Sequence, residues 1–142
     1  MTWYLDGNNL LGVLGLRGPG DARVLLVNRL LRMRLPRPCV LVFDGPPAPE
    51  VASASGGAGL RVLFSGGRSA DDLIAERLRP GDRVVTRDRE LGLRARDRRG
   101  RPVAPAEFFS DLKPTRRTPD GEKPEPGSNL DEWMKVFGER DP

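Results

Sequence analysis

The sequence contains no histidine, and this absence excludes several common kinds of catalytic site. Ser-His-Asp catalysis, Cys-His catalysis and zinc sites of the H-E-x-x-H type all need an imidazole. Lysine is also scarce, because the only three lysines are Lys113, Lys123 and Lys135, late in the chain. An enzyme with this composition would therefore rely on carboxylates, hydroxyl groups or a hard metal ion.

Cysteine and long apolar runs are equally sparse. Cys39 is the only cysteine among the 142 residues, which excludes an internal disulfide and a zinc site built from thiolates. No apolar run approaches the roughly 18 residues that span a membrane. No basic segment of a signal peptide precedes the first strand-like residues, which begin at Thr2. We therefore expect one soluble, cytoplasmic domain that makes no membrane contact.

What the sequence does contain is an alternation of short apolar runs with helical patterns. The apolar runs predict strands at 2–5, 39–43, 60–64, 83–86 and around Val103. Apolar faces with helical spacing separate or follow these strands, at 21–34, 70–79, 88–98 and 105–112. Such an alternation predicts an α/β fold, with a mostly parallel central sheet and helices on both faces.

Two stretches break this alternation. Residues 46–59 are rich in proline, glycine, alanine and serine, and we expect them to form a surface loop. Residues 113–128 contain four prolines and two glycines, which is typical of a linker that leaves a domain. The sequence thus divides into a domain at 1–112, a linker at 113–128 and a C-terminal segment at 129–142.

The C-terminal segment is predicted to form a short amphipathic helix. Its apolar residues stand at positions i, i+3, i+4 and i+7, namely Leu130, Trp133, Met134 and Phe137. A helix this short is not stable alone in water. Docking on its own domain explains the apolar face, and so does binding to a protein or ribosome partner.

Five aspartates stand where predicted strands end or where the following helices begin. They are Asp6 in LDGNN, Asp44 in VFDG, Asp71 and Asp72 in SADDLIAERL, and Asp88 in VTRDREL. Strand ends and the starts of the following helices share one edge of a parallel sheet, so these carboxylates are expected to meet in one crevice. Grouped carboxylates repel one another, and a bound Mg²⁺ or Mn²⁺ ion would remove that repulsion.

Each of these aspartates also has a local structural explanation. Asp6 and Asp44 precede glycines and fit turns, while Ser69 and Asp72 resemble a capping box. Asp88 fits the N-cap of a helix. None of these local explanations accounts for the gathering of all the acids at one predicted edge.

The motifs LDGNN, VFDG, SADDLIAERL and VTRDREL, in this order and at these spacings, resemble the YacP-like branch of NYN-domain proteins. The resemblance covers residues 1 to about 112 and implies a PIN-like nuclease fold. It also implies a metal-dependent endoribonuclease, in which aspartates hold Mg²⁺ or Mn²⁺. The residues that match the acidic positions of the family are Asp6, Asp71, Asp72 and Asp88.

Further roles follow from this resemblance and from the chemistry of hydrolysis. The four matching aspartates would contact the metal directly or through water, and the metal would activate a water for attack on a phosphodiester. Asn9 matches the D-G-x-N asparagine of the family and would orient water or phosphate. Asp44 is an additional candidate, as is Thr86, which would donate a hydrogen bond to a metal-binding group. The implied substrate is RNA, either single-stranded mRNA or structured RNA.

The charge distribution favours a polyanionic substrate. Residues 113–142 hold six basic and seven acidic residues of the 24 and 20 in the chain, which leaves 18 basic and 13 acidic residues in 1–112. The densest basic run is RARDRRGR, just downstream of Asp88, and a basic surface beside an acidic metal site suits nucleic acid. The candidate substrate contacts are Arg87, Arg94, Arg96, Arg98 and Arg99. A solvated helix end, where the dipole favours cations, explains the same run without a function.

Three other functions each explain fewer of these motifs. The segment GVLGLRG suggests a dinucleotide site. Its spacing, however, is G-x-x-G-x-x-G rather than G-x-G-x-x-G, and it follows a predicted turn rather than a strand. A phosphatase with an aspartate nucleophile needs a second acid two residues after Asp6, where the chain has Asn8. The main alternative is a PIN-like module that binds RNA or a protein without cleavage, although the complete set of acids favours cleavage.

Overall fold

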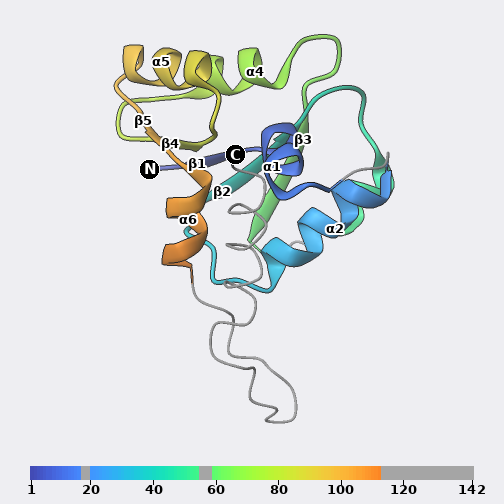
Figure 1. The fold of residues 1–142 in the computed structure, drawn as a ribbon. Coiled ribbons are helices and arrows are strands. Elements are labelled where there is room, and N and C mark those ends of the chain that lie inside the picture. The colour runs from blue at the N-terminus through green and yellow to red at the C-terminus, as the bar shows by residue number, and fades with distance from the viewer. Residues whose placement is uncertain (17–19, 55–58, 113–142) are drawn as a thin grey trace.

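A computed structural model of the chain describes residues 1–16, 20–54 and 59–112. Within these residues, five parallel strands form one sheet in the order β3-β2-β1-β4-β5 (Figure 1). The strands are β1 (Trp3–Asp6), β2 (Cys39–Phe43), β3 (Leu60–Phe64), β4 (Arg83–Val85) and β5 (Arg101–Val103). Each strand coincides, within a residue or two, with an apolar run that predicts a strand.

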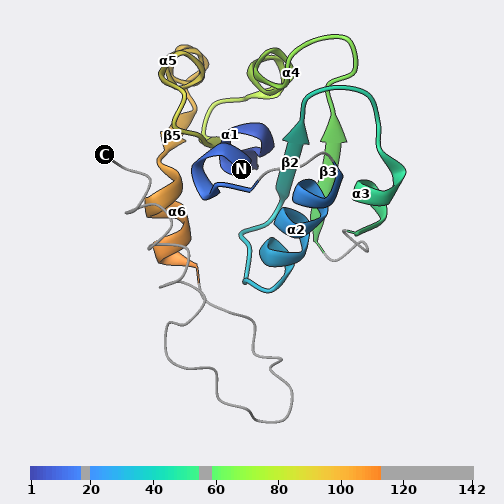
Figure 2. The same cartoon turned by 45° about the vertical axis from the view of Figure 1, so that its right-hand side comes forward.

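Six helices of the described residues cover the two faces of this sheet (Figures 1 and 2). The apolar core on one face is closed by α1 (Gly7–Leu14), α2 (Gly20–Leu31), α3 (Pro49–Ala54) and α6 (Pro105–Asp111). The core on the other face is closed by α4 (Ala70–Arg77) and α5 (Arg89–Asp97). The predicted α/β class, with a parallel sheet between two helical layers, is therefore confirmed.

Burial on both faces explains why the central strands are almost continuously apolar. All five residues of β2 are buried, and three of the four residues of β1 are buried. On the first face, Leu10 and Leu30 pack into the same core as Phe43. On the second face, Ile74 and Leu91 do the same around Val84. Strand β1 is thus held between two apolar layers. Only its amino and carboxyl ends, at the amino and carboxyl edges of the sheet, lie outside these layers.

Helix α1 begins where the local explanation of LDGNN places a turn. The glycines and asparagines of this segment have low helical propensity. Nevertheless Leu10, Val13 and Leu14 are buried at helical spacing, so packing against the sheet stabilises the helix. The helix ends at Gly15, whose φ of 73° lies in the left-handed region that glycine adopts readily.

Helix α3 corrects the surface loop predicted at 46–59. The helix begins at Pro49, and Glu50 lies in its first turn, both of which favour a helix start. Val51 is fully buried in the core next to α2. One buried side chain and a favourable first turn therefore hold a short helix in a segment whose composition is typical of a loop.

The predicted linker at 113–128 and the predicted helix at 129–142 lie outside the described residues, so both stay predictions. Among the residues that the structure does describe, no helix is long and apolar enough to cross a membrane.

Candidate active site

The order of the strands creates a switch point beside β1. The chain runs outward from β1 through β2 and β3, and then returns to the other side of β1 to form β4 and β5. Open α/β sheets bind ligands at such a point, outside the carboxyl ends of the strands. Asp6 ends β1, Asp44 follows β2, and Thr86 follows β4. These residues therefore lie at the carboxyl edge of the sheet, where ligands are expected to bind.

Asp6 is the most buried acid at this edge. Only 4% of its surface is exposed, and its Oδ2 accepts a hydrogen bond of 3.0 Å from the Thr86 hydroxyl. Burial raises the pKa of Asp6 to about 6, although the Thr86 hydrogen bond opposes the rise. The negative charges of Asp88 and Asp44 raise the pKa further. A nearby positive charge would therefore stabilise the ionised form of Asp6.

The Thr86 hydroxyl links two parts of the site. It donates to Asp6 and also accepts a hydrogen bond of 3.0 Å from the backbone N–H of Asp88. Thr86 is itself buried, and its backbone N–H donates to the carbonyl of Val103. The hydroxyl therefore holds the start of α5 in a defined position relative to the end of β1.

Asp71 and Asp88 meet where α4 and α5 begin. Asp88 caps α5, because its Oδ1 accepts hydrogen bonds of 2.9 and 3.3 Å from the N–H groups of Glu90 and Leu91. Burial raises the pKa of Asp71 to about 6, and the charges of Asp6 and Asp88 and a hydrogen bond with the Asp88 side chain add to the rise. The N-cap expected for Asp88 is thus present, together with a place in the acidic group.

Asp44 approaches the same group while holding two elements together. Its Oδ1 accepts a hydrogen bond of 2.6 Å from the N–H of Ala70, the first residue of α4. Its own N–H donates to Oδ1 of Asn8 in α1, at 2.8 Å. Its charge is close enough to raise the pKa values of Asp6 and Asp71. Asp44 therefore ties β2, α1 and α4 together beside the other carboxylates.

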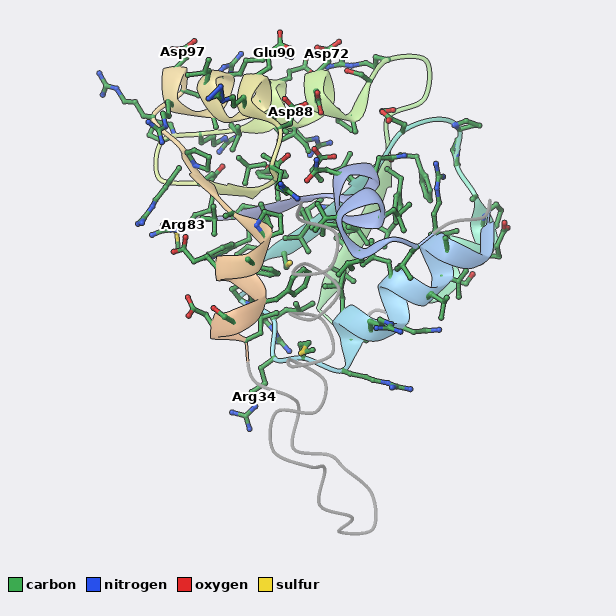
Figure 3. All side chains as sticks on the ribbon, in the orientation of Figure 1. Arg34, Asp72, Arg83, Asp88, Glu90 and Asp97 are labelled. Atoms are coloured by element: carbon green, nitrogen blue, oxygen red, sulfur yellow. The ribbon has the colours of Figure 1, made fainter. Side chains whose placement is uncertain are left out.

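Asp72 was predicted to contact the metal with the other aspartates, but it lies apart from this acidic group. Its Oδ1 forms an ion pair of 3.0 Å with Nη1 of Arg94. The hydrogen bond from Arg94 lowers the pKa of Asp72, in contrast to the raised pKa of its neighbour Asp71. Its backbone N–H donates to the Ser69 hydroxyl, which is half of the expected capping box. Figure 3 shows Asp72 and Glu90 on the outer side of the α4–α5 layer.

Asn9 and Arg87 lie at the border of the acidic group. The backbone N–H of Arg87 donates to Oδ1 of Asn9 at 2.9 Å, which joins α1 to the loop that follows β4. Both residues line an open pocket together with Asn8, Gly12 and Val13. Two residues predicted to contact substrate are therefore brought together beside the aspartates.

The basic run that begins at Arg94 does not form a surface beside the aspartates. Arg94 pairs with Asp72, and Arg96, Arg98 and Arg99 lie at and beyond the last turn of α5. Helix α5 leads away from the aspartates for 9 residues, which is roughly 13 Å at 1.5 Å per residue. We expected these three arginines to lie next to the acidic site. They lie instead toward the opposite edge of the sheet, where β5 begins.

Sequence reasoning missed the contributions of Asn8 and Arg23. Nη2 of Arg23 donates to the backbone oxygen of Asp44 at 3.1 Å, and its guanidinium lies 4.9 Å from the ring centre of Phe43. No local signal marks this arginine, because its place depends on how α2 packs across the sheet. Asn8 was detectable in principle, since it lies only two residues after Asp6, at the same end of the sheet.

The donor set of the site fits a hydrated hard cation. The carboxylates of Asp6, Asp71 and Asp88 supply oxygen atoms, and burial, with a smaller contribution from neighbouring carboxylates, raises the pKa values of Asp6 and Asp71. Among the described residues, however, no group of three or more acidic or cysteine side chains is placed to hold a metal ion. Mg²⁺ usually keeps several of its waters, so it can bind through a mixture of direct and water-mediated contacts.

Comparisons with known proteins bear on the fold. No protein-family model matches the sequence, and no curated protein matches it. The structure is similar to the crystal structure of a tryptophan-to-leucine mutant of Rae1 (YacP) from Bacillus subtilis, with a TM-score of 0.57 and 16% sequence identity. The similarity covers 77% of this chain and 72% of that chain. At this identity the similarity shows the fold alone, and the fold is the PIN-like α/β fold that the motifs imply.

Proposed function

We propose that the protein is a divalent-metal-dependent endoribonuclease, which hydrolyses RNA phosphodiester bonds at the carboxyl edge of its sheet. The observation that carries the proposal is that Asp6, Asp71 and Asp88 gather at the switch point, although their negative charges repel one another. The likeness in fold to YacP and the motifs that resemble YacP-like proteins support the same function.

Asp6, Asp71 and Asp88 are the residues that would hold the metal, directly or through water. When bound, Mg²⁺ or Mn²⁺ supplies a water of lowered pKa and a positive charge beside the scissile phosphate. Thr86 keeps the Asp6 carboxylate in place, and the hydrogen bonds at the start of α5 do the same for Asp88. Asp44 positions the start of α4, on which Asp71 lies.

Groups around the aspartates would bind the phosphates of the substrate. The oxygen of the Asn9 side chain accepts from Arg87, so its NH₂ group is the part that would donate to a phosphate or a water. Arg87 is exposed at the same border, and Arg23 adds a positive charge near Asp44. The excess of basic residues in 1–112 suits a polyanion such as RNA.

The neighbours Asp71 and Asp72 allow a matched test of this proposal. An end-labelled RNA is incubated with the full-length protein in Mn²⁺, in Mg²⁺ or in EDTA. We expect the parent protein and the Asp72→Asn variant to cleave with a metal and not in EDTA. The Asp71→Asn variant should lose on the order of 100-fold in rate, because a metal contributes several kcal/mol to such reactions. Cleavage by Asp71→Asn at the parent rate would refute the site.

A module that binds RNA without cleavage is the second candidate function. The observation that favours it is that no group of three metal-holding side chains occurs in the described residues. RNA binding by the parent protein, combined with no cleavage in either metal, would establish this second function instead.

A further inference from the structure

Three neighbouring strands begin in register at the amino edge of the sheet, opposite the aspartates. Trp3 of β1 pairs with Arg83 of β4, and Arg83 pairs with Arg101 of β5. Residues paired in a parallel sheet point to the same face, and neighbouring strands lie about 4.8 Å apart. Trp3, Arg83 and Arg101 thus form a row, here called the arginine row, on the face that α6 covers.

Among the described residues, the two guanidinium groups of the arginine row form no ion pair. The ion pairs among the described residues join Arg68 to Glu76 and Arg94 to Asp72, and neither involves the row. Nε of Arg83 is buried and has no hydrogen-bond partner in the described structure. Like charges side by side are unfavourable in a sheet, and a buried donor without an acceptor loses its hydration. Both observations point to an anionic acceptor that binds between the strands.

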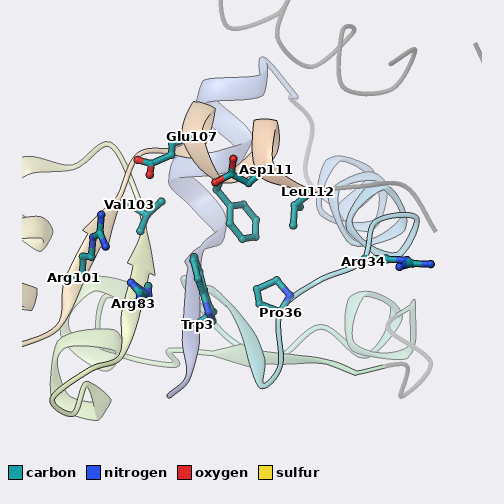
Figure 4. Close-up of a pocket in the computed structure, with 10 residues that line it drawn as sticks. Trp3, Arg34, Pro36, Arg83, Arg101, Val103, Glu107, Asp111 and Leu112 are labelled. Atoms are coloured by element: carbon teal, nitrogen blue, oxygen red, sulfur yellow. The ribbon is translucent and has the colours of Figure 1, made fainter. Parts of the chain in front are cut away.

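The arginine row forms one wall of a hollow of about 470 Å³. Figure 4 shows Arg83 and Arg101 side by side next to Trp3, while Arg34 points away from them. The Trp3 ring has the Arg83 guanidinium 5.4 Å from its centre and the Phe108 ring at 5.5 Å. The hollow therefore combines positive charge with a partly exposed aromatic ring. These are the two elements of a surface that binds single-stranded nucleic acid.

We propose that the arginine row is a second nucleic-acid contact, in which Arg83 and Arg101 each contact a backbone phosphate and Trp3 faces the adjoining nucleotide. Guanidinium groups match the geometry of phosphate oxygens and form strong, charge-assisted hydrogen bonds with them. The proposal rests on the proposed function in one respect, since the strand that it holds is the substrate bound at the carboxyl edge.

The charge around the hollow favours nucleic acid over an acidic protein segment. Arg98 and Arg99 precede β5 at the same edge, and Arg37, Arg61 and Arg77 line a separate hollow on the other face of the sheet. Glu107 and Asp111 of α6 also line the first hollow, and neither forms an ion pair within the described residues. An edge that is basic on both faces suits a long polyanion.

The test measures binding without cleavage, so its outcome does not depend on nuclease activity. A labelled 20-nucleotide oligouridylate is titrated with full-length protein in EDTA at several salt concentrations. The Arg83→Gln/Arg101→Gln variant should bind about 25-fold more weakly at 0.1 M salt, because each lost phosphate contact lowers the salt slope by about 0.7. The Arg61→Gln/Arg77→Gln variant removes the same charge on the opposite face, and we expect a clearly smaller loss.

The emission of Trp3 provides a second readout. In a Trp133→Phe background Trp3 is the only tryptophan, and unlabelled oligouridylate should quench its fluorescence. Equal losses in the two double variants would overturn the proposal in favour of general charge attraction. No response of Trp3 would overturn it in favour of an acidic protein segment in the hollow. Arg101→Gln alone, at an exposed position, serves if the Arg83 variant does not fold.

Discussion

The geometry of the acidic group depends on a single hydroxyl at the residue scale. Thr86 donates to Asp6 and accepts from the N–H of Asp88, so it sets both the charge of one carboxylate and the position of another. Its donated hydrogen bond lowers the pKa of Asp6, against the larger effect of burial. The ionised form of Asp6 therefore depends on this contact.

Removal of the hydroxyl should move the titration of Asp6. In the metal-free Thr86→Val protein we expect the pKa of Asp6 to rise above its value of about 6. The rise should be about one to two units, because a hydrogen bond to a charged group contributes about 1.5–3 kcal/mol. Carbon-13 NMR of the aspartate carboxyl groups measures the shift. The Thr86→Ser protein keeps the hydroxyl and should titrate near the parent, and equal titration of all three proteins would contradict this role.

The sequence identifies which residues are near the site better than it identifies which way they point. Asp6 and Asp88 follow apolar strands directly, so their edge could be predicted from local pattern alone. Asp71 and Asp72 are adjacent, and neighbouring residues of a helix point about 100° apart, as 3.6 residues per turn requires. The burial of Ala70 and Ile74 sets the phase of α4 and turns Asp72 outward, and that packing is not visible in the sequence motif.

At the element scale, α1 carries Asn8 and Asn9 to the site through an unusually close approach to β2. A side-chain carbon at Gly7 would lie 2.6 Å from the ring of Phe43 and 2.8 Å from the carbonyl oxygen of Val42. Real carbon atoms do not approach so closely, and the carbonyl cannot move without moving the strand. Gly7 is therefore required for packing.

Two glycines of α1 should respond to alanine in opposite directions. Gly7→Ala should lower the free energy of unfolding by about 1–3 kcal/mol, because it overpacks the contact with β2. Gly12→Ala should raise it by up to about 1 kcal/mol, since a carbon atom there meets nothing within 4 Å and alanine favours the helix. Urea denaturation measures both values. A Gly7→Ala protein as stable as the parent would show that α1 can move away from β2 at little cost.

Helix α1 is one of two helices that the sequence alone does not predict. The five strands and helices α2, α4, α5 and α6 follow from apolar periodicity, which is a local property of the chain. Helices α1 and α3 contain glycine, asparagine or proline, and their helical state depends on contacts with distant strands and helices. Leu10 and Val51 provide those contacts only after the sheet has formed. Tertiary burial therefore decides the elements that local propensity assigns to turns and loops.

At the scale of the whole molecule, the sheet separates charge between its two edges. The carboxyl edge gathers Asp6, Asp71 and Asp88, and the amino edge carries the arginine row. A carboxyl group whose pKa is raised binds its proton more tightly in the folded than in the unfolded chain. For Asp6 the pKa rises from 3.8 to about 6, so the metal-free protein loses stability as the pH rises through this window. The loss for this one group is at most about 3 kcal/mol.

A divalent cation should recover this stability at neutral pH. At pH 7, Mn²⁺ at 100 times its Kd should stabilise the parent protein by about 2.7 kcal/mol, because it binds only the folded state. At pH 5 the gain should be smaller, since protons compete with Mn²⁺ for the same carboxylates. Thermal unfolding in EDTA and in Mn²⁺, at both pH values, measures the difference.

Asp71→Asn removes a charge that repels the neighbouring carboxylates. Its metal-free stability at pH 7 should therefore equal or exceed that of the parent, while its gain in stability from Mn²⁺ should be largely lost. Asp72→Asn, one residue along the helix and turned outward, should keep the parent's gain. An equal response of these two variants would mean that the cation does not distinguish the acidic group from the protein surface, and the metal site would then have to be placed elsewhere.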